Sequence, residues 1–389
     1  MVPIVIIVIN TFLIYNKKRM NLQKTKITIL GGGNMGSVLS VKFSQKFDVT
    51  LFLNAPYEKV SDYRQDMVVF NEDKSTFIKG KIQKITDNLE EAIKDADWIF
   101  VTFPSFLFAK SSQEIIPLLH SGQHLVGVPG SGGFELYFKD ALNKGVTITG
   151  LQRVHSVARI ITKGQEVRES GVRTSIRCAS IPASFNKEAS KFISDCYSLP
   201  VEPLDNYLNV TLLNSNPILH TSRLYTIFKD YLSKKEYDTL PLFYEEWSLE
   251  SSELLEKMDQ ELFNMFKVLG EHDMPVNQIT TLLKHYDSNN TVEMTKKLNS
   301  INSLKGLTTP SKLNENGKYI PDLSSRYFTA DFPYGLDILL SFSYILGVAA
   351  PNMQKVSDWY HQVTNTERAF YLRDFGLKNI DDLKEIYSK

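Results

Sequence analysis

The sequence predicts an α/β protein in which an N-terminal Rossmann domain, a doubly wound parallel sheet, is followed by a mostly α-helical C-terminal domain. Three observations predict this fold class. A glycine-rich turn joins a short apolar strand to a helix near the start of the chain, strand and helix patterns alternate as far as residue 150, and strand patterns almost vanish beyond about residue 204. Strands that alternate with helical patterns indicate a right-handed parallel sheet.

The glycine-rich turn follows an apolar, β-branched strand over 26–30 and satisfies G-x-G-x-x-G with Gly31, Gly33 and Gly36. The first glycine permits a tight turn, the second lets a pyrophosphate approach the backbone, and the third lets the helix lie close to the strand. The helix N-terminus then offers free N–H groups and a positive dipole end. The turn therefore favours a dinucleotide site over a merely structural turn.

Further strands and helices follow the turn in alternation. Pro104 ends one strand at the carboxyl edge of the sheet, where ligands lie in doubly wound folds. A second glycine-rich turn at 129–133 is either an ordinary left-handed turn or a backbone edge for a ligand. Short β-branched stretches from 154 to about 182, such as 172–177, are expected to complete the sheet and cover its cofactor edge. The expected helices span 38–47, 88–95, 111–119 and 135 to about 143, and the expected strands 49–53, 98–103, 124–128 and 146–150.

The C-terminal half reads as helices. Residues 249–269 carry an apolar stripe at helical spacing, and 336–346 and 352–364 also predict helices. We expect three segments: an apolar extension over 1–19, a dinucleotide-binding domain over 20–203 and a helical substrate domain over 204–389. The preferred interpretation is that an upstream start codon adds the extension as a non-functional tail before Met20, and a membrane anchor is the alternative.

Composition excludes several classes of function. With 44 basic and 44 acidic residues in 389, no net field favours nucleic acid or an acidic membrane. The two cysteines, Cys178 and Cys196, form no C-x-x-C pair, which argues against cysteine-ligated zinc and is compatible with a reducing cytoplasm. The sequence leaves open whether the chain forms a homodimer.

Two segments of the C-terminal half supply groups suited to hydride transfer at a carbonyl or imine. Residues 214–220 deliver His220 after a proline-containing turn, and residues 326–336 contain Arg326 and Asp331. Histidine gives and takes a proton near pH 7, and a carboxylate on its other ring nitrogen fixes the tautomer. Arginine clamps a substrate carboxylate with two parallel hydrogen bonds. These groups need no metal.

Together these residues resemble the octopine/nopaline, or opine, dehydrogenase family, and the resemblance covers nearly everything from Met20 onward. It is carried by residues 159–182, Asn216-Pro217-x-x-His220, 243–246, 259–261, 326–336 and 346–351. It implies NAD(P)H-dependent reductive condensation of an amino acid with an α-keto acid, pyruvate first. It also implies that His220 is the acid/base, that Asp331 is its partner, and that Arg326 and Asn216 bind substrate.

The resemblance has two departures. Ala330 stands where an acidic residue commonly precedes the aspartate. Asn54 ends the second strand, where an NAD enzyme usually carries an acid for the ribose 2′-hydroxyl, and Lys59 and Arg64 are the nearest cations. NADP is therefore slightly favoured and NAD stays open. The residues expected to hold the cofactor are Gly31, Gly33, Asn34, Met35, Gly36, Asn54 and Pro104.

Two other functions remain as alternatives. A related 2-keto or 3-hydroxy acid dehydrogenase, such as a ketopantoate reductase-like enzyme, would share the two-domain layout, but those families lean on a lysine as acid. A non-catalytic nucleotide-binding protein would not require His220, Asp331 and Arg326. Of the other histidines, His155 is the one that could face the cofactor cleft.

Overall fold

The computed structural model describes residues 25–55, 57–276, 280–368 and 370–388, which form two compact units. The first unit extends to Gly130 and resumes over Phe134–Tyr207, and the second holds Ser131–Gly133 and Leu208–Lys389. The extension expected over 1–19 lies outside the described residues. Within the described ranges, no helix combines the length and the apolar character required to cross a membrane.

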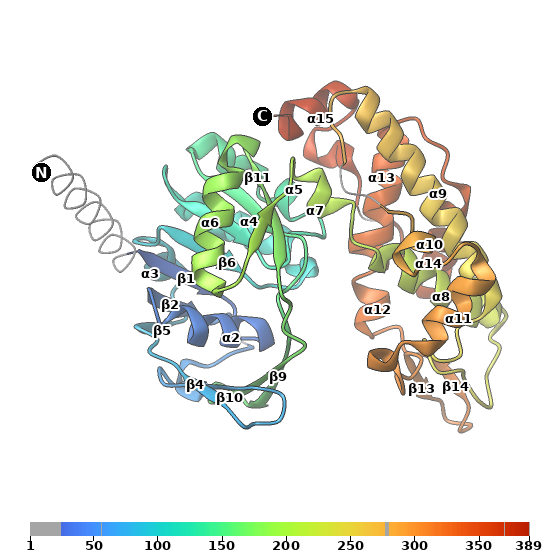
Figure 1. The fold of residues 1–389 in the computed structure, drawn as a ribbon, viewed down its shortest axis with the longest axis horizontal. Helices are drawn as coiled ribbons and strands as arrows, with labels where there is room; N and C mark the ends of the chain where they lie inside the picture. Colours follow the sequence, from blue (N-terminus) through green and yellow to red (C-terminus); the bar gives the residue numbers. More distant parts are fainter. Residues whose placement is uncertain (1–24, 56, 277–279, 369, 389) are drawn as a thin grey trace, which may run out of the picture. The chain divides into compact units, whose positions relative to one another are not determined.

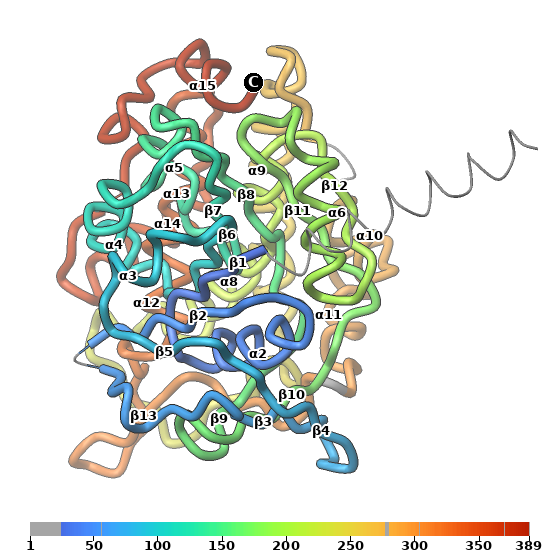
Figure 2. The backbone as a smooth tube through the Cα atoms, turned by 90° about the vertical axis from the view of Figure 1, so that its left-hand side faces the viewer, coloured from blue at the N-terminus to red at the C-terminus, as the bar shows by residue number. Residues whose placement is uncertain are grey.

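The first unit is built on an eight-stranded sheet whose order is β12-β11-β8-β7-β6-β1-β2-β5 once its strands are labelled along the chain. These strands are β1 (Lys26–Leu30), β2 (Asp48–Phe52), β5 (Lys84–Thr86), β6 (Trp98–Val101), β7 (His124–Gly127), β8 (Thr147–Leu151), β11 (Ile176–Ile181) and β12 (Val201–Pro203). All neighbours run parallel except β8 and β11. Since β1 pairs with β2 on one side and β6 on the other, the strand order reverses at β1 (Figure 2), and ligands bind beyond the carboxyl ends of strands at such a point.

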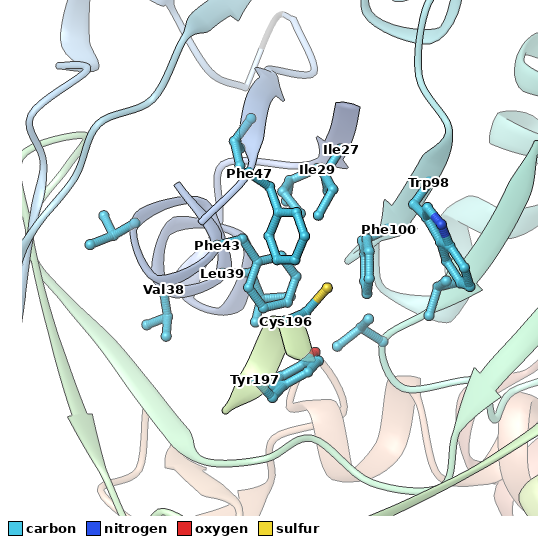
Figure 3. Packing of buried hydrophobic residues seen from close by; sticks show 14 of the residues in the cluster. Ile27, Ile29, Val38, Leu39, Phe43, Phe47, Trp98, Phe100, Cys196 and Tyr197 are labelled. Carbon is cyan, nitrogen blue, oxygen red and sulfur yellow. The ribbon is translucent and has the colours of Figure 1, made fainter. Parts of the chain in front are cut away.

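Helices cover both faces of this sheet. Ile27 and Ile29 of β1 pack into a core with α2 and α6, whereas the Thr28 hydroxyl between them donates to a carbonyl of α3 on the opposite face. Figure 3 shows the core between the sheet and helices α2 and α6. In this core the Phe43 ring centroid lies 5.1 Å from that of Phe100. The helices and turns of this unit are α2 (Asn34–Phe43), η1 (Val60–Asp62), α3 (Leu89–Ile93), η2 (Ser105–Leu107), α4 (Phe108–Ile115), η3 (Ile116–Leu118), α5 (Phe134–Tyr137), η4 (Lys139–Lys144), η5 (Ala183–Phe185) and α6 (Asn186–Tyr197).

A second, four-stranded sheet in this unit corrects the expectation for residues 154–182. It is made of β3 (Val68–Phe70), β4 (Phe77–Lys79), β9 (Val157–Thr162) and β10 (Glu166–Ser170), in the order β4-β3-β10-β9. β9 and β10 pair with each other as an antiparallel hairpin, so only β11 joins the main sheet. Val172 is 53% exposed and precedes that strand. The run 172–177 is therefore mostly loop.

Three predicted helices differ from the observed ones. The helix expected over 111–119 begins earlier, as α4, and ends in the 3₁₀ turn η3. The helix expected over 38–47 is α2, which begins at Asn34 because Gly33 acts as its N-cap, and ends at Phe43. The helix expected from 135 to about 143 is divided into α5 and the 3₁₀ turn η4.

The second unit is mainly helical, as the sequence predicts (Figure 1). The apolar stripe over 249–269 coincides with α9, which contacts α8, α11 and α14. On α9, the Glu261 carboxylate accepts the N–H groups of Asn352 and Met353 at 2.7 and 2.9 Å and so caps α14. The elements are α7 (Leu208–Thr211), α8 (Asn216–Phe228), η6 (Lys229–Ser233), α9 (Leu249–Glu271), α10 (Leu282–His285), α11 (Thr291–Ser300), η7 (Asn302–Leu304), β13 (Ser311–Leu313), β14 (Tyr319–Pro321), α12 (Arg326–Thr329), the π-helical turn η8 (Phe332–Leu336), α13 (Asp337–Ile345), α14 (Pro351–Thr364), η9 (Leu372–Phe375) and α15 (Ile380–Tyr387).

Candidate active site

The glycine-rich turn lies between β1 and the N-terminus of α2, and its backbone fits a pyrophosphate. Gly31 has φ +109°, and a Cβ on Gly36 would lie 1.8 Å from the Gly31 carbonyl oxygen, so neither position accepts a side chain. At Gly33, by contrast, a Cβ would meet nothing within 4 Å, which leaves the turn open on that side. Among the residues that the structure describes, no side chain caps the N-terminus of α2. Its N–H groups are thus available to an anion.

The remaining cofactor residues lie around this turn. Asn34 and Met35 form the first turn of α2, and the Asn34 side chain accepts the N–H of Ile160 at 2.8 Å. Asn54 follows β2, and Pro104 follows β6 as the N-cap of η2. Since β2 and β6 flank β1 in parallel, these residues share the carboxyl edge of the sheet. The structure thus gathers the predicted cofactor residues at the sheet edge where a dinucleotide would bind.

In the second unit, His220 on α8 and Asp331 before η8 form a close pair. His220 Nδ1 lies 2.8 Å from Asp331 Oδ2, and the two side chains are 12% and 19% exposed. A carboxylate only accepts hydrogen bonds, so Nδ1 carries the proton and Nε2 of the neutral ring bears the lone pair. This arrangement leaves Nε2 as the nitrogen that can accept or release a proton.

The local sequence explains how residues so far apart in the chain meet. Pro217 lies in the first turn of α8, where its missing N–H costs nothing. A Cβ on Gly335 in η8 would lie 2.8 Å from Pro217 Cγ, so glycine lets η8 approach α8 closely. This contact between the two motifs sets Asp331 opposite His220.

The Tyr244 hydroxyl lies 2.8 Å from His220 Nε2, and the sequence did not identify this contact. Burial raises the pKa of Tyr244 well above its usual range, and electrostatic repulsion from the neighbouring Tyr327 adds to this shift. The phenol therefore stays protonated and can donate to Nε2. The Tyr327 ring also packs on the imidazole, with centroids 4.6 Å apart. Tyr244 lies within the motif over 243–246 that contributes to the family resemblance, but the sequence alone assigned no function to any residue of that motif.

Arg223 on α8, three residues after His220, holds the loop that carries Tyr244. It is 2% exposed, and its guanidinium donates to the carbonyls of Phe243 at 3.0 Å and Glu246 at 2.6 Å. Burial lowers its pKa to about 10, which leaves it charged at neutral pH. A single helix thus supplies both the histidine and the arginine that fixes its tyrosine partner.

The two predicted substrate residues are accessible. Arg326 is the first residue of α12 and is exposed, five residues before Asp331. Asn216, half-buried, is the first residue of α8, four residues before His220. Both lie at the start of helices that carry or lead to the His220–Asp331 pair.

His155 does not face a cofactor cleft. It is fully buried, and its Nε2 lies 2.6 Å from Glu169 Oε1, while Lys42 of α2 pairs with Glu169 at 2.8 Å. This cluster ties α2 to β10 and belongs to the core.

Comparison with known proteins identifies two family models in the chain. The α-helical domain of NAD/NADP octopine/nopaline dehydrogenase matches residues 203–364, and the N-terminus of NAD-dependent glycerol-3-phosphate dehydrogenase matches residues 26–172. The His220–Asp331 pair lies in the first of these matches and the glycine-rich turn in the second.

Curated relatives match along most of their length. Tauropine dehydrogenase of Arabella iricolor is 25% identical over 368 residues, covering 88% of this chain and 92% of the relative. Octopine dehydrogenase of Pecten maximus is 24% identical over 384 residues, covering 92% of this chain and 94% of the relative. A solved structure of octopine dehydrogenase with NADH and L-arginine has the same fold, with a TM-score of 0.83 at 20% identity over 92% of this chain and 98% of that chain.

Proposed function

Since the chain belongs to the octopine/nopaline dehydrogenase family, we propose that it condenses an α-keto acid with the amino group of an amino acid and reduces the product with NAD(P)H. The chain is thus an oxidoreductase of the class that acts on CH–NH bonds. Pyruvate is the first choice of keto acid. The observation that carries this proposal is the 2.8 Å pair of His220 and Asp331 within the matched helical domain.

The net reaction joins a keto acid, an amino acid, NAD(P)H and a proton into a secondary-amine dicarboxylate, NAD(P)⁺ and water. When bound, the cofactor supplies the hydride. His220 Nε2 supplies and accepts protons as the carbonyl oxygen leaves as water and the amine forms, which is the role of a positioned acid/base near neutral pH. Asp331 holds the proton on Nδ1 and stabilises the imidazolium when it forms.

We propose that Arg326 binds a substrate carboxylate and that Asn216 contributes a polar contact. A guanidinium at an exposed helix start presents a planar pair of donors that matches a carboxylate. Tyr244 keeps Nε2 oriented through its hydroxyl. The free, buried cysteines Cys178 and Cys196 support a reducing location such as the cytoplasm.

The alternative of a ketopantoate reductase-like enzyme is disfavoured by the groups around His220. Those families lean on a lysine as acid, whereas here the ring nitrogens are bound by Asp331 and Tyr244. The two functions also differ in what they require, because reduction of a keto or hydroxy acid needs no amine.

A matrix of keto acids against amino acids tests the proposal, with oxidation of NADH and of NADPH as the signal. We expect oxidation only when both an α-keto acid and an amino acid are present, with a secondary-amine dicarboxylate as product by mass spectrometry. Reactions lacking the amine serve as controls. Oxidation by a keto acid alone at the same rate would refute condensation in favour of a simple keto acid reductase.

A further inference from the structure

A carboxylate that the sequence motif did not indicate lies at the end of β2. Glu58 Oε2 accepts the N–H of Gly32 at 3.1 Å and the N–H of Asn54 at 3.0 Å. The Tyr63 hydroxyl lies 3.2 Å from Glu58 Oε1 and 3.0 Å from the Gly32 carbonyl. Glu58 therefore bridges the glycine-rich turn and Asn54, which lies two residues after β2, although Glu58 is four residues further along the chain than Asn54.

The packing around Glu58 fixes its position. Tyr63 is 7% exposed, and burial together with the neighbouring Glu58 charge raises its pKa above its usual range, so it remains a hydroxyl donor. A Cβ on Gly32 would lie 2.5 Å from a methyl carbon of Leu53 and 2.7 Å from the Tyr63 hydroxyl. The loop is thus fastened to the turn, and Glu58 is held rather than free in solvent.

This place corresponds to the ribose end of a dinucleotide site. In Rossmann domains, an acid at the end of the second strand hydrogen-bonds the adenosine ribose beside the glycine-rich turn. Next to it, a pocket at the ends of β2 and β6 is lined by apolar side chains that include Phe52, Tyr57, Phe103 and Leu107, together with Asn54 and with Lys110 and Glu114 of α4. Aromatic and aliphatic walls of this kind suit the flat face of an adenine base.

The chemistry of the contact discriminates between two cofactors. A carboxylate accepts roughly four hydrogen bonds, and the two N–H donors, with the Tyr63 hydroxyl shared between Glu58 and the Gly32 carbonyl, leave capacity for ribose hydroxyls. A 2′-phosphate offers no donor there and brings a like negative charge against Glu58.

The basic side chains near this loop do not reverse that preference. Lys163 donates to a main-chain carbonyl of the loop at 2.9 Å, and Lys110 pairs with an acid of its own helix at 3.7 Å. Lys59 and Arg64 flank Glu58 in sequence but are exposed. The group bonded to the turn is the acid.

We propose that Glu58 selects the unphosphorylated adenosine ribose, so that this chain prefers NADH to NADPH. The preference is opposite to the one that Asn54 indicates by itself, because Glu58 supplies from a loop the acid that Rossmann enzymes usually place at the strand end. The inference rests on the proposed function in one respect only, namely that the cofactor is NADH or NADPH.

Equilibrium binding of NADH and NADPH, followed by cofactor fluorescence, tests this proposal without turnover. We expect the wild-type chain to bind NADH at least tenfold more tightly. Glu58→Gln, which keeps the shape and removes the charge, should reduce that ratio about tenfold, as should Glu58→Ala. A purely structural role would weaken both cofactors equally and leave the ratio unchanged.

Asp62→Asn is the matched control, because Asp62 ends η1 in the same loop and carries the same charge, and among the described residues it is Glu58, not Asp62, whose carboxylate is hydrogen-bonded to the turn. It should change the ratio less than twofold. The affinities of the wild-type chain for 5′-AMP and for adenosine 2′,5′-bisphosphate can also be compared without any variant. We expect 5′-AMP to bind more tightly. A wild-type preference for the phosphorylated ligands, an unchanged ratio in both Glu58 variants, or equal shifts in Asp62→Asn would overturn the proposal. If the ratio behaves as expected but no amino acid is condensed, the proposed function fails and this inference stands.

Discussion

At the scale of single residues, the candidate site depends on how His220 is held. Asp331 binds one ring nitrogen, Tyr244 binds the other, and Tyr327 packs on the ring. The imidazole is thereby fixed in tautomer and orientation before any substrate contact. This constraint is what a proton-transferring group requires, because the efficiency of acid/base catalysis depends on geometry first and pKa second.

Replacing His220 by Asn should lower turnover about 10²-fold or more, the usual effect of removing a positioned acid/base. Asp331→Asn should also be damaging, since it leaves the ring unoriented, and the double variant should lose little more than His220→Asn alone. NADH binding should be unchanged. His361→Asn is the control, because His361 pairs with Asp337 at 2.8 Å outside the proposed site. Turnover of His220→Asn within a few-fold of wild type would exclude the proposed role.

Removing only the hydroxyl of Tyr244, as Tyr244→Phe, should lower kcat about tenfold, the value of one hydrogen bond of about 1.4 kcal/mol. The ring still packs beside Phe243, with centroids 4.9 Å apart, so the fold should be retained. The KM for the cofactor should not change. Tyr360→Phe, a buried tyrosine that stacks on Phe332 at 4.3 Å, provides a comparison that should remain near wild type. An equal loss in the two variants would assign Tyr244 a packing role only.

At the scale of elements, helices and loops are tied together by buried polar groups. Arg223 fastens the loop over 242–248 to α8, and Glu261 caps α14 from α9. Both residues satisfy backbone groups that would otherwise be buried without partners, which costs about 1–3 kcal/mol for each group. The geometry of His220 therefore depends on these ties as well as on its direct contacts.

Arg223→Lys should lower both thermal stability and turnover. Lysine cannot reproduce the planar fork that reaches the carbonyls of Phe243 and Glu246 together, so at least one carbonyl loses its partner. We expect the unfolding midpoint to fall by several degrees by calorimetry, and kcat to fall as the Tyr244 loop loosens. Arg373→Lys, at a side chain that is 70% exposed, should leave both unchanged. A stable variant with full activity would show that the loop does not depend on Arg223.

These elements also explain how much the sequence could predict. The strand over 26–30 and α9 were predictable from their local apolar patterns, and the glycine turn was predictable from the spacing of its glycines. The sheet of β3, β4, β9 and β10 was missed, since three-residue strands such as Val68–Phe70 carry no periodic signal. His220 and Asp331 stood out through their motifs. The contacts of Tyr244 with His220 and of Glu58 with Gly32 arise from loop conformation, which local patterns do not encode.

At the scale of the whole molecule, the two units contain buried acids that respond to pH in opposite directions. In the first unit, burial opposes ionisation of Glu169, but hydrogen bonds from His155 and Lys42 outweigh it and lower its pKa to about 2. A carboxyl group with a lowered folded-state pKa stabilises the fold above its unfolded pKa, and this contribution is lost as pH falls. Burial also lowers the pKa of His155, so below about pH 6.5 this histidine takes up a proton in the unfolded chain more readily than in the folded one. This difference adds to the loss of stability in acid.

In the second unit, burial raises the pKa of Asp259 to about 6, although its carboxylate accepts the N–H of Leu282 at 2.8 Å. A carboxyl group whose folded-state pKa is raised contributes stability that is fully present below its unfolded pKa, near 3.8. That contribution is lost as pH rises through about 6. Over two pKa units the effect is up to about 3 kcal/mol.

Calorimetric unfolding between pH 7 and pH 4 should therefore separate the responses of the two units. Asp259→Asn should remove the gain of the second unit on acidification, so that its midpoint falls relative to wild type as pH is lowered from 7 to 4. Glu169→Gln should flatten the acid-induced loss of the first unit below about pH 4.5, because the group that must be protonated is no longer present. NADH identifies which transition belongs to the first unit, since a ligand raises only the midpoint of the unit that binds it. If Asp259→Asn parallels wild type at every pH, the Asp259 carboxyl does not titrate near 6. If Glu169→Gln loses stability in acid as steeply as wild type, the Lys42–Glu169–His155 cluster does not govern the acid stability of the nucleotide-binding unit.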